Sequence, residues 1–149
     1  MKKMKLLVCA LLVTSLAMGM AVTGSQSVAA KTKKKTVIII KMTNKKISYK
    51  KSIGLTKYLG SDILGDGLVG IGKTKKIKIA KKCKFYYITN YKKDSKKIVK
   101  GSKKKLIKML KGDIKPAKMT EKGKTFYAGV AFKLTIKKGK VVKVKQIYE

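Results

Sequence analysis

One segment of the chain has the spacing of a phosphate-binding loop. Residues 67–74 read GLVGIGKT and satisfy the P-loop pattern G-x-x-x-x-G-K-[ST] at every defined position. Such a loop binds phosphates when a buried strand precedes it and a helix follows it, because backbone amides and the helix dipole then meet the ligand. The residues after Thr74 alternate between lysine and isoleucine, which indicates a strand. We therefore expect no nucleotide site here, and we expect the overlapping glycines from Gly65 onward to form a turn.

The other reactive side chains are too few and too isolated to indicate catalysis. Asp62 and Asp66 are the nearest pair of acids, whereas hard cations require several oxygen ligands. Cys83 has no histidine to activate it, because the chain contains none, so we expect a buried, inert thiol on a strand. The sequence therefore predicts no enzyme activity, no cofactor and no metal site.

The remaining chemistry is cationic. All 40 basic residues are lysines, they face only six acids, and the formal net charge is +34. Arginine is the usual side chain for bidentate recognition of bases and phosphates, whereas lysine is a hydrated point charge. Lysines alone suit diffuse binding to polyanions, in which counterion release supplies the affinity. We expect a polyanion partner and no sequence-specific nucleic-acid recognition; the alternative is a merely solvated lysine surface.

The most specific candidate site lies on two predicted strands, at 76–79 and 83–89. Alternate residues there are apolar and are expected to face inward, so that the lysines and Tyr86 between them face outward. Lys133 takes an outward position in a later strand at 125–137. The candidate polyanion-binding residues are Lys76, Lys78, Lys84, Tyr86 and Lys133.

The elements that position these residues are mostly strands. Apolar and β-branched patterns predict strands at 36–42, 45–50, 68–71, 76–79, 83–89, 125–137 and 141–148. Residues 102–111 predict a short helix that Ser102 caps and Gly112 ends. Residues 31–35 are expected to be a mobile basic lead-in, and residues 90–101 a polar loop.

From residue 68 onward the predicted order is three strands, a helix and two strands, which is the element order of an OB-fold. In this order the chain resembles small secreted OB-like domains of unknown function that are common in Gram-positive bacteria. The resemblance covers residues 68–148. It implies a mainly β fold: a small OB-like five-stranded barrel with one short helix between strands three and four. Residues 60–149 would form this domain, and residues 31–59 a β-rich N-terminal segment before it.

The first 30 residues have the three-part layout of a secretory signal peptide. Lys2, Lys3 and Lys5 precede an apolar run at 6–22, and a small-residue stretch ends at Ala30. We expect cleavage after Ala30; the alternative is a retained N-terminal anchor. The chain beyond the leader keeps 37 lysines and a single cysteine, which excludes a disulfide within it.

These observations predict a secreted, non-enzymatic protein associated with the cell envelope. Its lysine surface would bind anionic polymers such as teichoic acid, and peripheral contact with a membrane surface is compatible with it. The alternative is an extracellular OB-like module that binds single-stranded nucleic acid or an anionic glycan, with Tyr86 as a stacking platform. A membrane-active factor would require a long amphipathic helix, and only a short helix is expected. The sequence does not indicate an oligomeric state.

Overall fold

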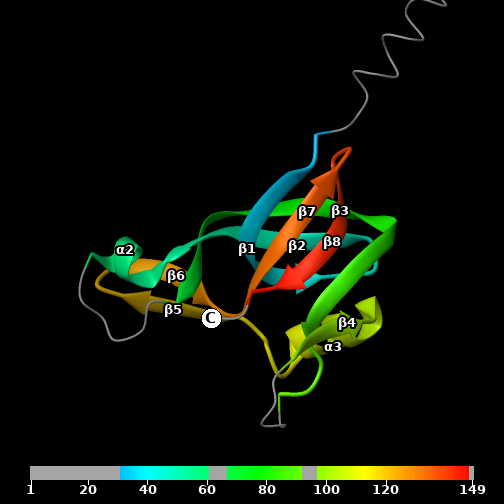
Figure 1. Ribbon diagram of the computed structural model, residues 1–149. Helices are drawn as coiled ribbons and strands as arrows, with labels where there is room; N and C mark the ends of the chain where they lie inside the picture. Colours follow the sequence, from blue (N-terminus) through cyan, green and yellow to red (C-terminus); the bar gives the residue numbers. More distant parts are fainter. Residues whose placement is uncertain (1–30, 61–66, 92–96, 148–149) are drawn as a thin grey trace, which may run out of the picture. The chain divides into compact units, whose positions relative to one another are not determined.

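Strands dominate the computed structural model, which describes residues 31–60, 67–91 and 97–147. The described chain from Thr32 onward belongs to one unit. In chain order its elements are β1 (Lys33–Met42), β2 (Lys46–Gly54), α2 (Leu55–Leu59), β3 (Leu68–Ile88), β4 (Ile98–Gly101), α3 (Lys103–Lys111), β5 (Ala117–Glu121), β6 (Lys124–Ala128), β7 (Ala131–Lys137) and β8 (Lys140–Gln146). The prediction of a mainly β fold is confirmed (Figure 1).

β1 and β2 form an antiparallel hairpin with a short turn at residues 43–45. The amide of Thr43 donates to the carbonyl of Lys46 at 2.9 Å and closes this turn. β1 begins at Lys33, and Lys33, Lys34 and Lys35 pair with residues of β7. The expectation of a mobile lead-in is therefore wrong for these three lysines, because the β7 ladder holds their backbone.

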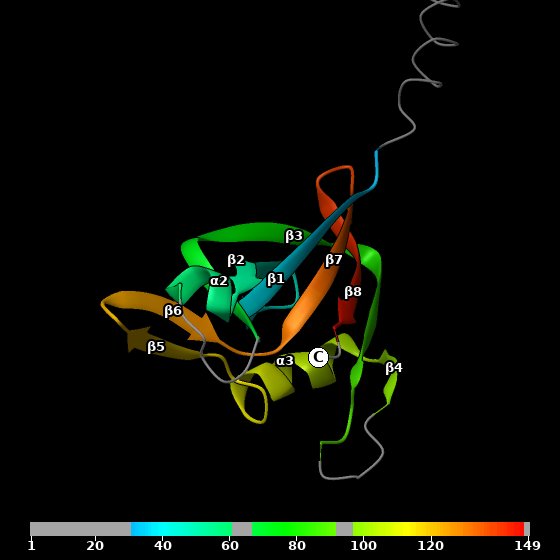
Figure 2. The ribbon, with the colours of Figure 1, turned by 60° about the vertical axis from the view of Figure 1, so that its left-hand side comes forward.

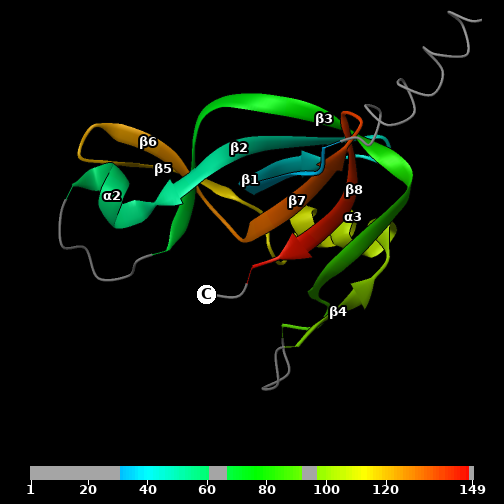
Figure 3. The same cartoon turned by 45° about the horizontal axis from the view of Figure 1, so that its top comes forward.

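β3 is a single strand of 21 residues where the sequence predicted three separate strands. It changes partners along its length: it pairs with β2 from Leu68 to Lys78, and with β8 from Lys78 to Tyr86. A register shift between Ile79 and Lys84 separates well-paired stretches of the β8 ladder. Lysines interrupt the apolar pattern without ending the strand, because they occupy its exposed positions. Figure 3 shows β3 curving over the other strands as one long ribbon.

The predicted strand at 125–137 consists of two strands, β6 and β7. β6 pairs with β5 and β3, whereas β7 pairs with β1 and β8. The chain passes between them at Gly129, where an added Cβ would lie 3.1 Å from the Cβ of Pro116. β5 was not predicted, and its five residues are all exposed.

The eight strands of the described residues belong to one sheet in the order β2-β1-β7-β8-β3-β6-β5, with β4 paired to β3 and a further pairing of β2 with β3. The prediction of a five-stranded barrel that starts at residue 68 is not confirmed. β1 and β2, which precede residue 68, belong to the same sheet and each pair with two strands, and α3 lies between β4 and β5 in the chain. The sequence pattern could not reveal this arrangement, because it depends on which distant strands pair.

α3 confirms the predicted helix. The Ser102 hydroxyl accepts a hydrogen bond from the Lys105 amide at 3.2 Å, and Gly112 follows the last turn. Leu106, Met109 and Leu110 are buried against the main core, which offsets the unfavourable lysines in the first turn. Figure 2 shows α3 crossing below β1, β7 and β8.

Two apolar clusters fill the fold. The main cluster gathers buried residues of β1, β2, β3, β7, β8 and α3, including the fully buried Tyr87 and Phe132. The second cluster is smaller and joins Leu59, Val69 and Phe126 from α2, β3 and β6. The candidate site therefore lies on strands whose opposite face is anchored in the main cluster.

Candidate functional site

A row of outward-facing residues crosses four neighbouring strands. Tyr86 of β3 pairs with Lys100 of β4 and with Lys145 of β8. Lys145 in turn pairs with Lys133 of β7. Directly paired residues point to the same side of a sheet, and the three lysines are exposed while Tyr86 is half-buried. The strand pairing thus places Tyr86 in a row with three exposed lysines.

A second row runs beside the first, two residues along β3 and β8. Lys84 pairs with Lys143, and both are exposed. Successive residues of a strand alternate between faces, so residues two apart share one face. We call the combined surface the basic face; it consists of Lys84, Tyr86, Lys100, Lys133, Lys143 and Lys145. Its main strands β3, β8 and β7 are neighbours in the sheet (Figure 1).

The Tyr86 ring already carries one cation. The Nζ atom of Lys143 lies 5.0 Å from the centre of this ring. A cation over an aromatic face is attracted by the ring quadrupole, by about 0.5–1 kcal/mol at exposed sites. The contact places the Lys143 ammonium beside the aromatic ring, where an anionic ligand with a flat or apolar part could meet both.

The basic face is electrostatically unfavourable in the absence of a partner. The pairs Lys84–Lys143 and Lys133–Lys145 place like charges directly opposite each other on adjacent strands. Such pairs destabilise a sheet, by the same physics that makes opposite-charge pairs stabilise it. Polar features that oppose folding are often found at functional sites. The arrangement indicates a surface suited to an anion that neutralises it.

The structure brings together three of the five predicted site residues, namely Lys84, Tyr86 and Lys133. Lys76 and Lys78 are exposed, as expected, but they lie beyond the register shift of β3 and pair with β2. Lys78 belongs to a separate line of exposed, paired lysines, which we call the hairpin row. This row consists of Lys46, Lys78, Lys140 and Lys137.

Sequence reasoning missed Lys100, Lys143 and Lys145. The signal for Lys143 and Lys145 was present, because buried residues at 141, 144 and 146 leave both lysines exposed on β8. Their position beside Tyr86 was not readable, because β8 runs parallel to β3 and the two strands are distant in sequence. Lys100 lies on β4, in a segment that was expected to be a loop.

The P-loop pattern forms no phosphate-binding loop. Residues 68–74 belong to β3, and the strand continues past Thr74, as the alternating pattern predicted. No helix begins there, so the helix dipole that such a loop requires is absent from this part of the described chain. Asp62, Gly65 and Asp66 lie outside the described residues.

Cys83 is a half-buried thiol packed against the main cluster. Burial raises its pKa to about 11, although the charge of Lys103 acts in the opposite direction. Reactive cysteines require a thiolate, so a raised pKa makes this thiol a poor nucleophile at neutral pH. Within the described ranges, no group of three or more histidine, cysteine, aspartate or glutamate residues could hold a metal ion.

Among the residues that the structure covers, no helix is long and apolar enough to cross a membrane. Comparison with known proteins gave no match: no family model, no curated protein and no solved structure matches the chain.

Proposed function

We propose that this is a secreted, non-enzymatic protein of the cell envelope that binds anionic polymers such as teichoic acid through the basic face. One observation carries the proposal: paired lysines, Lys84 with Lys143 and Lys133 with Lys145, face each other around Tyr86. A polyanion bound between these lysines would neutralise their charges, so that attraction to the ligand outweighs the repulsion between the lysines. Beyond the leader, 37 lysines against six acids leave a formal charge of +31, which adds a long-range field that attracts such a polymer.

The chemistry of the face favours a repeating anion over a defined sequence. Its cations are all lysines, and the chain contains no arginine for bidentate reading of base edges. Lysines spaced by strand pairing can follow successive phosphates along a flexible polymer. Affinity would then come mainly from released counterions.

The strand ladders support an OB-like arrangement as the framework for this function. β1 pairs with β2, β2 with β3, β3 with β8, β8 with β7, and β7 with β1. OB-folds bind oligonucleotides and oligosaccharides on an outer strand face. The alternative function follows from this: an extracellular module for single-stranded nucleic acid or an anionic glycan. The half-exposed Tyr86 beside Lys143 favours it, because bases stack on such rings.

Replacing Tyr86 distinguishes the two functions. If bases stack on the ring, Tyr86→Ala should weaken binding of single-stranded DNA by about 1–3 kcal/mol. Binding of teichoic acid should stay nearly unchanged, because that polymer offers no flat base. Fluorescence anisotropy with a labelled oligonucleotide, and competition by teichoic acid, would measure both affinities.

Tyr127→Ala is the matched control for this test. Tyr127 is also half-buried and also lies under a lysine, with the Nζ atom of Lys50 5.0 Å from its ring centre, but it belongs to β6. This control should leave both affinities unchanged. Equal losses for the two variants would reject a stacking role for Tyr86, and a protein that binds neither polymer at low ionic strength would refute the polyanion function itself.

Export is part of the proposal. It rests on the charged, apolar and small-residue sections of residues 1–30, which lie outside the described residues. Peripheral contact with anionic lipid headgroups would use the same basic face, because headgroups and wall polymers present similar charges.

A further inference from the structure

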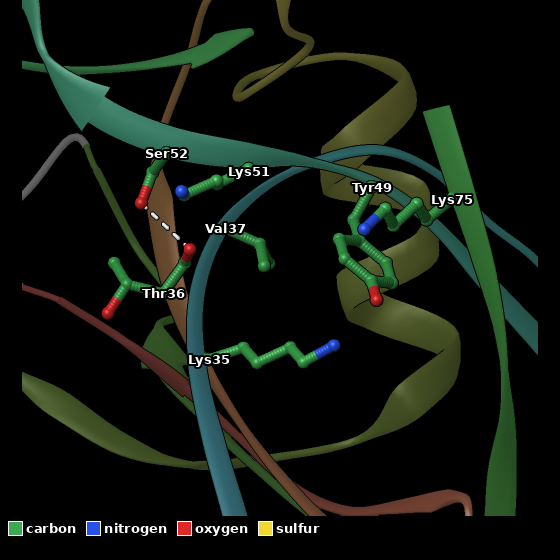
Figure 4. Close-up of a pocket in the computed structure, with 7 residues that line it drawn as sticks. All are labelled: Lys35, Thr36, Val37, Tyr49, Lys51, Ser52 and Lys75. Atoms are coloured by element: carbon green, nitrogen blue, oxygen red, sulfur yellow. Dashed lines mark hydrogen bonds between the residues drawn. The ribbon is translucent and has the colours of Figure 1, made fainter. Parts of the chain in front are cut away.

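A cavity of about 380 Å³ lies between β1, β2 and β3, away from the residues of the basic face. Lysines from all three strands line it: Lys35 from β1, Lys51 from β2 and Lys75 from β3. Tyr49 and Val37 contribute an aromatic and an aliphatic wall (Figure 4). Three exposed lysines therefore line one partly apolar hollow.

These lysines occupy positions that strand alternation assigns to the core-facing side. Residues two apart on a strand share one face. Lys35 therefore shares a face of β1 with the buried Val37 and Ile39, and Lys51 shares a face of β2 with the buried Tyr49. Lys75 precedes Ile77, which packs against the main cluster, in the same manner. On each of these three adjacent strands, a lysine thus takes the position next to the core-facing apolar residues.

The register places the three lysines around the same hollow. Lys51 pairs with Val37 of β1, and Lys75 pairs with Tyr49 of β2. Paired residues have Cβ atoms about 4.5–5.5 Å apart and point to the same side. In Figure 4 the amines of Lys35 and Lys75 extend toward the Tyr49 ring, whereas the amine of Lys51 extends toward Ser52 on the other side of the hollow. Within the described residues, these three amines and the Tyr49 hydroxyl make no hydrogen bond.

The three lysine amines and the Tyr49 hydroxyl of the cavity suit a dianion with several oxygens better than a single carboxylate. Three ammonium groups exceed the charge of one carboxylate, whereas a phosphate monoester carries close to two charges and three terminal oxygens. Lysines bind phosphate as point charges from several directions and need no planar partner. The cavity volume also exceeds that of one phosphate and falls in the range of small-molecule pockets.

We infer that this cavity binds a single phosphate monoester carried on a small polyol or sugar. Lys35 and Lys75 hold the phosphate from the Tyr49 side and Lys51 holds it from the Ser52 side. The Tyr49 hydroxyl donates to the phosphate, and the Tyr49 ring and Val37 contact the carbon chain. The site is separate from the basic face and does not depend on the proposed polymer binding. It gives the protein a saturable small-molecule site beside its extended polymer surface.

Titration of the purified protein with glycerol 3-phosphate tests this site. Isothermal calorimetry at 150 mM NaCl should give saturable binding with one ligand per chain. Lys35→Gln, Lys51→Gln and Lys75→Gln should each weaken binding about tenfold or more, because each removes a hydrogen bond to a charged group. Tyr49→Phe keeps the ring and should weaken binding about threefold to tenfold.

The matched controls are Lys34→Gln and Lys76→Gln. Each control removes the same charge from the neighbour of a pocket lysine on the same strand, at a position on the opposite face. They should leave affinity for glycerol 3-phosphate within twofold. Inorganic phosphate should bind more weakly than glycerol 3-phosphate, because it lacks the carbon chain.

Two results would overturn this inference. One is the absence of saturable binding by the wild-type protein, and the other is equal loss in the pocket and control variants. If a pocket variant does not fold, NMR of the wild type decides: the Val37 methyl and Tyr49 ring signals must shift with glycerol 3-phosphate. Failure of this site would leave polymer binding by the basic face intact, so the two proposals fail separately.

Discussion

Affinity for an anionic polymer should fall about 100-fold between 50 and 200 mM salt. The basic face offers five lysines, and about five phosphate contacts on a single strand give a slope of about −3.5 in log affinity against log salt. Anisotropy titrations with polyphosphate or single-stranded DNA at several NaCl concentrations would measure this slope.

Dextran, a neutral polymer, is the control for this titration and should not bind at any salt concentration. An affinity that stays constant from 50 to 200 mM NaCl would contradict the electrostatic account. The lysines would then serve only to solubilise the protein.

Joint replacement of four basic-face lysines should reduce polymer affinity about 600-fold at 0.1 M salt. The variant carries Lys→Gln at the four positions that form the facing pairs: Lys84, Lys133, Lys143 and Lys145. Each lost contact removes about 0.7 from the slope for a single strand, and the salt-dependent term is largest at low salt. The slope itself should drop by about 3, which the same titrations would reveal.

The control for this variant removes the same charge from other exposed positions. It carries Lys→Gln at four exposed lysines of α2, α3 and β5: Lys57, Lys104, Lys108 and Lys118. It should lose affinity only modestly, since these lysines do not lie on the basic face. Equal losses in the two variants would show that net charge, and not this face, determines binding.

Local patterns in the sequence predicted the parts of the fold that depend on neighbouring residues. Alternation correctly gave the inward positions of Phe85 and Tyr87, which lie in the main cluster. The caps Ser102 and Gly112 correctly bounded α3. A turn at Lys138 and Gly139, both with positive φ, joins β7 to β8.

Long-range pairing could not be predicted from such patterns. Lysines at exposed positions divided β3 into apparent fragments, although one backbone ladder continues through them. The pattern of 125–137 looked continuous across Gly129, although the two halves have different partners. Lys35 looked like part of a flexible basic arm, because only its pairing with Leu134 of β7 shows that it belongs to a strand.

The same distinction explains how much of the candidate site was predicted. Lys84 and Tyr86 were identified because they lie on one strand and alternate with apolar residues. Lys145 was missed because it reaches Tyr86 only through the parallel ladder between β3 and β8. Lys35, Lys51 and Lys75, which line the cavity, were missed for a further reason. Alternation places each of them on the core-facing side of its strand. A single lysine at such a position does not indicate a binding site, and only the pairing of the strands shows that three of them lie together.

The most direct test of polymer binding by the basic face is an NMR titration of the isotope-labelled protein with a wall teichoic acid at 50 mM NaCl. We expect amide and side-chain shifts concentrated at Lys84, Tyr86, Lys133, Lys143 and Lys145, reversed by 500 mM NaCl. Signals of exposed lysines on α3, such as Lys104, should change little. Shifts spread evenly over all lysines, or centred on α3, would contradict the account.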